Sequence, residues 1–341
     1  MKQLRKGFVI LLAFLCLTLS ACRLELPLPT LQEINLLPEV ATESLETEPI
    51  TQPPTTQPPT TEPPQTQPRE TEPPETEPTE PPPLEVELPE PENSDFVRVR
   101  DYIPDIIVEL RYATEDNFTG QTIYTFDELW LRYGTVKKLI KVQDALRDHG
   151  MGLKVWDGFR PVAAQFALWE VYPNPTYVAN PNGGYSSHSR GNTIDLTVVD
   201  AEGNELTMPT GFDDFSKKAN RNYSDVSKEA ANNSKMLEGL MIDCGFTSIQ
   251  SEWWHFVDSK SYSPEKTFQP VGNLPYVGID GDVEFFSSQD DTQELLCMIP
   301  AEEVFSVIAL DGEYLLTEYR GVLGYVQTNQ VVPVELAGSG E

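Results

Sequence analysis

The chain has 341 residues and a formal net charge of −30 at pH 7, with 54 acidic side chains against 24 basic ones. Residues 1–21 carry +3 and residues 22–94 carry −14, which leaves −19 for residues 95–341. So acidic a domain lacks the basic face that nucleic-acid binding requires, and nucleic acid is excluded as a partner. Electrostatic adhesion to anionic wall polymers or lipid headgroups is disfavoured for the same reason. The length allows two or three domains.

The first 21 residues are expected to form a targeting segment. Three basic residues precede the apolar stretch 8–19, which is too short to span a bilayer comfortably. Small residues then lead to Cys22, in a pattern that resembles a bacterial lipoprotein signal, in which the cysteine is lipidated and becomes the new N-terminus. We therefore expect an exported protein, anchored through a lipid on Cys22 at the outer face of the cytoplasmic membrane. The alternative is an ordinary secretory peptide cleaved near Ala21.

Residues 22–94 are expected to form an extended, disordered linker. Thr, Pro, Glu and Gln dominate this segment in near-repeats of Thr-Gln-Pro-Pro and Thr-Glu-Pro-Pro, and almost no apolar side chain occurs between Leu45 and Leu84. Such a segment has no core to bury, and its paired prolines favour extended polyproline II. The linker would project the next domain away from the membrane.

A globular pattern begins near Asp95, where predicted strands alternate with predicted helices. Strands are predicted over 106–112, 153–156, 194–199 and 253–257, and helices over 136–146, 161–171 and 227–244. Thr135 is the expected N-cap of the first helix, and Gly150 its expected stop. These elements predict a compact α+β domain over residues 95–270, with a small antiparallel sheet and flanking helices.

Two short segments of this domain carry the residue types of a catalytic metal site. His188 and Asp195 lie seven residues apart, and Glu252 and His255 follow in the sequence Glu-Trp-Trp-His. Two imidazoles and one carboxylate are three zinc ligands that leave a position open for water, and the second carboxylate can take the proton of that water. The alternative for a single His–Asp pair is a surface pair or a capped turn. The chain has only three histidines and two of them fall in these segments, which makes chance a poor explanation.

The spacing within the second segment raises a geometric difficulty. In a regular strand, Glu252 and His255 would point to opposite faces, because side chains alternate with a period of two. A bulge or a strand end must therefore turn both toward the metal. Arg160 lies between two turn-forming positions, where its guanidinium can face a developing oxyanion. The alternative for Arg160 is a surface ion pair.

Five parts of this domain, in the same order, resemble the D-alanyl-D-alanine dipeptidases of vancomycin-resistance and related systems. They are Leu110-Arg-Tyr-Ala-Thr with Asn117-Phe-Thr-Gly, Trp156-Asp-Gly-Phe-Arg-Pro, Ser186-Ser-His-Ser-Arg-Gly-Asn-Thr-Ile-Asp-Leu-Thr, Met208-Pro-Thr-Gly-Phe-Asp and Glu252-Trp-Trp-His. The wider family includes zinc carboxypeptidases that trim peptidoglycan peptides.

The resemblance implies the roles of the catalytic residues. It implies a zinc ion bound by His188, Asp195 and His255. It also implies Glu252 as the general base and later the acid, and Arg160 as the group that stabilises the oxyanion.

The resemblance also implies the substrate contacts. Tyr112 and Asp213 would hold the free ammonium of the substrate, and Ser186 would help to hold its C-terminal carboxylate. The segments of Tyr112 and Asp213 favour the dipeptidase branch. The alternative for Asp213 is a cap on a helix starting near Phe215. The chain departs from the family pattern at Thr193, where Ala is usual, and we expect crowding there without loss of the metal.

The implied activity is zinc-dependent hydrolysis of D-Ala-D-Ala to two D-Ala at the cell envelope. A second possibility is a zinc D,D- or L,D-carboxypeptidase or endopeptidase that trims peptidoglycan stem peptides. A possibility of another class is an inactive wall-binding lipoprotein, against which the intact metal ligands and base argue.

Residues 271–341 form a separate pattern. Alternation over 304–310 and 314–319, followed by Arg320-Gly-Val-Leu-Gly-Tyr-Val, predicts short strands joined by Gly turns. Residues 319–326 resemble bacterial SH3-like domains, many of which bind cell-wall peptides. We expect a small all-β SH3-like barrel that binds a wall peptide, with a purely structural appendage as the alternative. Cys244 and Cys297 are expected to be free thiols.

Overall fold

The computed structural model describes residues 82–86, 88–175, 177–291 and 293–334. The predicted signal segment, Cys22 and most of the predicted linker lie outside these residues. Within the described part of the chain, no helix is long and apolar enough to cross a membrane. The buried apolar side chains form two clusters, a larger one built mainly from residues 97–268 and a smaller one within the C-terminal strands.

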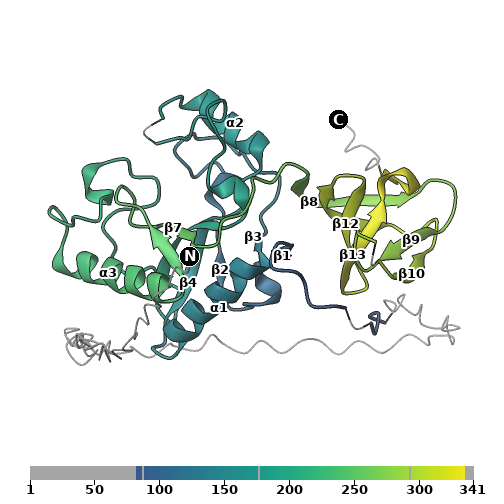
Figure 1. Ribbon diagram of the computed structural model, residues 1–341, viewed down its shortest axis with the longest axis horizontal. Helices are drawn as coiled ribbons and strands as arrows, with labels where there is room; N and C mark the ends of the chain where they lie inside the picture. Colours follow the sequence, from purple (N-terminus) through teal and green to yellow (C-terminus); the bar gives the residue numbers. More distant parts are fainter. Residues whose placement is uncertain (1–81, 87, 176, 292, 335–341) are drawn as a thin grey trace, which may run out of the picture. The chain divides into compact units, whose positions relative to one another are not determined.

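A five-stranded sheet is the framework of the larger part, which spans residues 95–267 (Figure 1). Its strands are β2 (Ile107–Val108), β4 (Gly152–Asp157), β5 (Thr193–Val199), β6 (Phe246–Ser248) and β7 (His255–Asp258). Their order is β2-β4-β5-β7-β6, and all pairs are antiparallel except β2 with β4. The predicted small antiparallel sheet is therefore confirmed except at one edge, where β2 and β4 are parallel. Every residue of β5 is buried, which agrees with its β-branched, apolar sequence and its central place.

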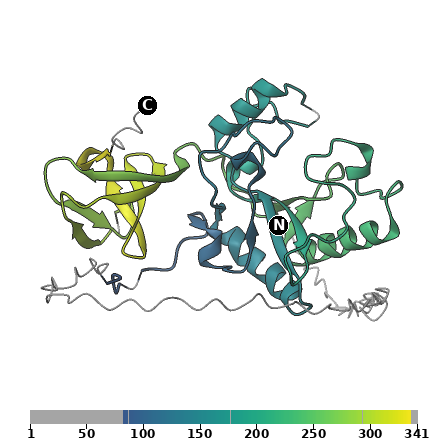
Figure 2. The ribbon, with the colours of Figure 1, turned by 180° about the vertical axis from the view of Figure 1, so that it is seen from behind.

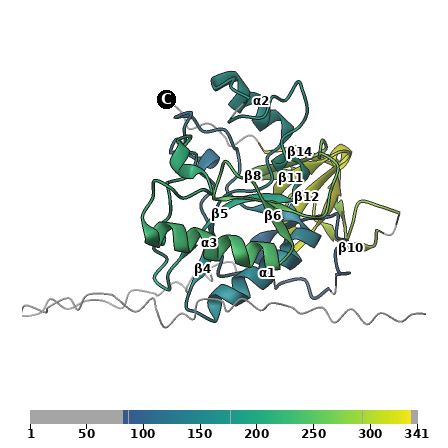
Figure 3. The same ribbon diagram turned by 60° about the vertical axis from the view of Figure 1, so that its left-hand side comes forward.

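Three α-helices flank this sheet: α1 (Tyr133–Arg147), α2 (Val162–Val171) and α3 (Lys228–Asp243). Helices α1 and α3 lie together on one side of the sheet, and α2 lies on the other side (Figures 1 and 3). The Ser227 hydroxyl caps α3 by accepting a hydrogen bond from the Ala230 backbone N–H at 3.1 Å. The predicted cap of α1 is wrong, because the helix begins at Tyr133 and places Thr135 inside its first turn. The Thr135 hydroxyl instead donates to Asp258 Oδ2 at 2.8 Å.

Short elements complete this larger part. They are the paired strands β1 (Phe96–Arg98) and β3 (Trp130–Arg132), and the 3₁₀ turns η2 (Val99–Asp101), η3 (Arg111–Ala113), η4 (His188–Arg190) and η5 (Lys217–Ala219). The strand predicted over 106–112 is too long, because β2 has only two residues and η3 follows it. The bend at η3 buries Tyr112, which is 2% exposed.

The C-terminal part is all-β, as expected, and its strands are the yellow-green arrows of Figure 2. They are β8 (Phe268–Gly278), β9 (Val283–Phe286), β10 (Leu295–Ile299), β11 (Phe305–Asp311), β12 (Tyr314–Tyr319), β13 (Val322–Gln327) and β14 (Val331–Pro333), with the 3₁₀ turn η6 (Thr328–Gln330) before β14. The sheet order is β10-β9-β13-β12-β11-β8-β14, and no pair between its two outer strands closes it in the described residues. Strand β8 also runs across residue 270, so the sheet begins before the predicted boundary.

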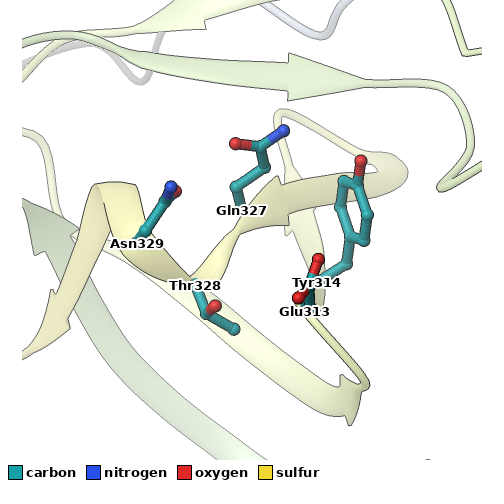
Figure 4. A pocket seen from close by; sticks show the side chains of 5 residues that line it. All are labelled: Glu313, Tyr314, Gln327, Thr328 and Asn329. Atoms are coloured by element: carbon teal, nitrogen blue, oxygen red, sulfur yellow. The ribbon is translucent and has the colours of Figure 1, made fainter.

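A tight hairpin joins β12 to β13. Arg320 and Gly321 form its turn with φ of 48° and 78°, the positive values that a two-residue type I′ turn needs. At the opposite end of the same two strands, five side chains line a pocket of about 210 Å³ (Figure 4): Glu313, Tyr314, Gln327, Thr328 and Asn329. The lining includes one carboxylate, one aromatic ring and no basic group. Both Cys244 and Cys297 are free thiols, as expected.

Candidate active site

The sheet register brings three site residues into one row. Asp157 on β4 pairs with Asp195 on β5, and Asp195 pairs with His255 on β7. Residues opposite each other on neighbouring strands share a face of the sheet, with Cβ atoms about 5 Å apart. The three side chains therefore meet although they come from distant parts of the sequence.

His188 reaches this row from the turn η4, which precedes β5. Its Nδ1 lies 2.8 Å from the carbonyl oxygen of Gly158. Since a carbonyl can only accept, Nδ1 carries the proton and the lone pair of Nε2 faces the row, 3.3 Å from Asp195 Oδ2. Gly191 ends the turn with φ of 72°, and a Cβ there would lie 2.4 Å from the Phe96 ring. Glycine is therefore required between His188 and β5.

These groups fit a zinc ion. One ligand atom from each of His188, Asp195 and His255 lies within 4.8 Å of the others, and all three residues are buried. His255 presents Nδ1, which is 2.9 Å from Asp195 Oδ1. Burial opposes ionisation of Asp195, but the two imidazoles outweigh it and hold the pKa of this carboxyl below its usual range. Two neutral imidazole nitrogens and one carboxylate form a catalytic zinc donor set, and the Gly158 carbonyl orients one imidazole from behind.

Glu252 lies directly before β7, which begins at His255 and not at Trp253 as predicted. The alternation problem therefore disappears, because Glu252 is not part of the strand. Its Oε2 lies 3.6 Å from His255 Nδ1, beside the metal ligands. Burial raises the pKa of Glu252, and the nearby His255 counteracts part of this rise. A carboxylate with a raised pKa next to a metal ligand suits a general base.

Arg160 is buried, so the surface-pair alternative is wrong. Its guanidinium donates to Asp157 Oδ2 through both Nε and Nη2, and through Nη1 to Gln165 Oε1 at 2.9 Å. It also lies over the Tyr112 ring, 5.1 Å from the centroid.

Asp157 is the functional residue that sequence reasoning missed. Besides Arg160, its carboxylate accepts hydrogen bonds from the Tyr124 hydroxyl at 2.6 Å and the Gly158 N–H at 2.8 Å. It lies 3.5 Å from His188 Nδ1, so one carboxylate contacts both Arg160 and His188. The spacing of three residues between Asp157 and Arg160 in one segment was the available signal.

Tyr112 is buried and Asp213 is half-buried, and their side chains form a hydrogen-bonded pair. The Tyr112 hydroxyl donates to Asp213 Oδ2 at 2.7 Å. Burial, and then the charge of Asp213, raise the pKa of Tyr112 well above its usual value, so the hydroxyl keeps its proton. Burial also raises the pKa of Asp213 to about 7, against the effect of the Tyr112 hydrogen bond. The capping alternative for Asp213 is wrong, because Ser216 is the N-cap of η5.

The remaining predicted residues lie close to the ligands. Ser186 is buried, and its Oγ accepts a hydrogen bond from the His188 N–H at 3.3 Å. Thr193 is fully buried two residues before Asp195, and its Oγ1 finds no hydrogen-bond partner among the described residues. The extra hydroxyl therefore lacks a partner among these residues, and the crowding expected at Thr193 stays a prediction.

Comparisons with known proteins agree with this geometry. Residues 92–270 match the Peptidase M15 family, described as D-ala-D-ala dipeptidase. The D-alanyl-D-alanine dipeptidase of Escherichia coli K12 is 37% identical over 165 residues, which cover 48% of this chain and 85% of that protein. Those of Enterococcus faecium and Streptomyces coelicolor are each 32% identical, covering 44% and 51% of this chain and 84% and 96% of theirs.

Among solved structures, the chain is similar to a mutant of the vancomycin-resistance D,D-pentapeptidase VanY in complex with Zn(II). The identity is 16%, the TM-score is 0.26, and the match covers 46% of this chain and 80% of that one. This likeness is too weak to add to the sequence matches.

Proposed function

The chain belongs to the D-Ala-D-Ala dipeptidase family of zinc peptidases, and on this basis we propose that it hydrolyses the free dipeptide D-Ala-D-Ala to two D-Ala. The observation that carries the proposal is the partly buried Tyr112–Asp213 pair, which is connected to His188 through Arg160 and Asp157. A buried carboxylate needs a cationic partner when it is ionised. The free α-ammonium of a dipeptide is such a cation, and the end of a longer stem peptide lacks it.

The metal ligands and Glu252 supply the hydrolytic chemistry. When bound, zinc lowers the pKa of a water molecule to about 7 and polarises the scissile carbonyl. Glu252 takes a proton from the attacking water and later gives it to the leaving amine. Its raised pKa brings it closer to neutral pH, where it can do both.

Arg160 is proposed to stabilise the oxyanion that forms at the attacked carbonyl. Asp157 and Gln165 hold its guanidinium before the substrate arrives, so little reorganisation accompanies the reaction. At the substrate's N-terminal end, the ammonium would bind Asp213, and the Tyr112 hydroxyl would keep that carboxylate in place. Ser186 would help to hold the C-terminal carboxylate.

The experiment that tests the proposal compares three substrates with the full-length protein: D-Ala-D-Ala, N-acetyl-D-Ala-D-Ala and a muramyl pentapeptide. Release of D-Ala is measured for each. We expect rapid cleavage of the free dipeptide and very poor cleavage of the other two. Discrimination against a substrate that leaves a polar group unpaired can reach about 10⁴-fold. Equal cleavage of free and acetylated dipeptide would favour the carboxypeptidase function instead.

The protein is further proposed to be exported and anchored by a lipid on Cys22. The basic residues, the short apolar stretch and the small residues before Cys22 support this proposal. The linker 22–94 would then project the enzyme from the membrane. In cells that produce the protein, Cys22→Ser should move it from the membrane fraction to the soluble fraction. A variant that stays in the membrane fraction would exclude the lipid as the anchor.

The C-terminal part is proposed to be an SH3-like module that binds wall peptides and holds the enzyme near the wall. The hairpin formed by 319–326 and the polar pocket of Figure 4 support this assignment. Binding of purified peptidoglycan by the full-length protein and by Glu313→Gln would test it. Equal binding by both proteins would exclude this pocket as the binding site.

A further inference from the structure

A second pocket opens directly beside the catalytic base. It has a volume of about 180 Å³, and Glu252 forms part of its lining. The rings of Tyr177 and Phe215 also line it, together with hydroxyl and amide groups and the charged side chains of Asp214 and Lys217. A space of this size holds several water molecules, so it can receive a group larger than a methyl.

Ring stacking and one hydrogen bond hold the aromatic side of the pocket in place. The rings of Tyr177 and Phe215 stack with centroids 4.4 Å apart, and the Tyr177 hydroxyl donates to the Phe215 carbonyl at 3.2 Å. Phe118 packs its edge against Phe215 at 5.3 Å. Such contacts join two loops that are distant in the sequence, so the pocket is preformed, as ligand sites usually are.

The two charged side chains Asp214 and Lys217 differ in whether they already interact with a neighbouring residue. Asp214 Oδ1 accepts a hydrogen bond from the Ser216 N–H at 2.7 Å and so stabilises the turn before η5. Lys217 is exposed and forms no ion pair within the described residues, although two carboxylates line the same pocket. Its ammonium is therefore the cation that a ligand in this pocket can use.

The chemistry of the proposed reaction decides which part of the substrate lies here. Glu252 gives its proton to the leaving amine, so the nitrogen of the leaving amino acid must contact Glu252. The carboxylate of that amino acid follows within the length of one residue, about 3.8 Å. The pocket beside Glu252 is the space that the leaving residue would enter.

Resting on the proposed function, we propose that this pocket is the subsite for the leaving amino acid, and that Lys217 binds its carboxylate. Ser186, the residue proposed above to help hold this carboxylate, carries no charge and does not line the pocket. Lys217 would thus be a specificity residue that requires a free carboxylate at the substrate's C-terminal end, just as Asp213 requires a free ammonium at the other end.

The test compares D-Ala-D-Ala with its C-terminal amide, D-Ala-D-Ala-NH₂, in the full-length zinc-loaded enzyme. Lys217→Gln should lower kcat/KM for the acid about tenfold, mainly through KM, and leave that for the amide close to the wild-type value. The ratio between the two substrates should therefore shrink. Lys218→Gln is the matched control, because Lys218 is the next exposed lysine of the same turn and does not line the pocket. Lys217→Arg should restore most of the preference.

The outcomes separate this inference from the function on which it rests. If the wild type releases no D-Ala from D-Ala-D-Ala, the proposed function and the subsite fail together. If the wild type cleaves the dipeptide and Lys217→Gln keeps the wild-type ratio of acid to amide, only the role of Lys217 is overturned. An equal loss of activity on both substrates would also overturn it, since Lys217 would then act on the fold or the metal and not on the carboxylate.

Discussion

Replacing Asp157 by Asn removes a negative charge from a buried position without changing the size of the side chain. The side chain of Asp157 is 0% exposed and that of its partner Arg160 is 10% exposed. The carboxylate accepts hydrogen bonds from Tyr124, Gly158 and Arg160. Asn keeps a single carbonyl oxygen, so its NH₂ group must face at least one of these donors. The Arg160 guanidinium also loses its counter-ion.

The expected cost follows from this burial. Removing one partner of a buried ion pair typically costs about 3–5 kcal/mol, because the other charge stays buried and unpaired. Since Asn fills the same volume, no cavity forms, and we expect the free energy of unfolding to fall by that amount. Asp105→Asn is the matched control. It breaks the pair with Arg147, whose side chains are 48% and 49% exposed, and should cost less than about 1 kcal/mol.

Urea unfolding at saturating zinc measures this difference. All 5 tryptophans lie between residues 130 and 254, so their fluorescence reports on the peptidase part alone. The kcat should fall as well, because Arg160 is no longer held toward the oxyanion. Complete loss of an oxyanion donor lowers kcat by about 10²–10³-fold, which sets the upper bound. If Asp157→Asn unfolds within about 1 kcal/mol of Asp105→Asn, the reasoning about this buried pair is refuted.

Other perturbations test the site in turn. His188→Ala should lose nearly all zinc in metal analysis, and full occupancy would remove His188 from the ligand set. Glu252→Gln should keep the metal and lose about 10²–10⁴-fold in kcat, because Gln cannot accept a proton; a wild-type kcat would exclude it as the base. Burial raises the pKa of Asp213 to about 7, so this group loses its charge as the pH falls through 7. The kcat/KM for D-Ala-D-Ala should decrease over the same range, and in Asp213→Asn the remaining activity should no longer show this decrease. If kcat/KM of Asp213→Asn still decreases at low pH as in the wild type, another group causes the decrease.

The elements that the sequence predicts well are those marked by a local pattern of residues. Ser227 and the apolar spacing behind it predict α3, and the β-branched run after His188 predicts β5. The candidate metal ligands were recognisable because two short segments hold two of the three His of the chain together with acidic residues. The resemblance added Tyr112 and Asp213, which lie 101 residues apart and yet share a hydrogen bond.

What the sequence could not provide depends on long-range pairing. The contact of Asp157 with His188 arises because β4 and β5 align Asp157 with Asp195, and no local pattern encodes this register. The alternative role of Asp213 as a helix cap was equally compatible with its neighbours. The structure excluded it, because Ser216 caps η5 and the Asp213 carboxylate accepts a hydrogen bond from the Tyr112 hydroxyl.

The row of Asp157, Asp195 and His255 also couples strand pairing to metal affinity. A strand that slips by one residue turns every side chain to the opposite face, so a slipped β5 would turn Asp195 away from the ion and a slipped β7 would turn His255 away. Because zinc binds only the correctly paired chain, its binding free energy is added to the stability of that pairing alone. During refolding, zinc should therefore draw misaligned chains toward the native alignment. The zinc content of a refolded sample would then measure the fraction of molecules whose strands are correctly paired.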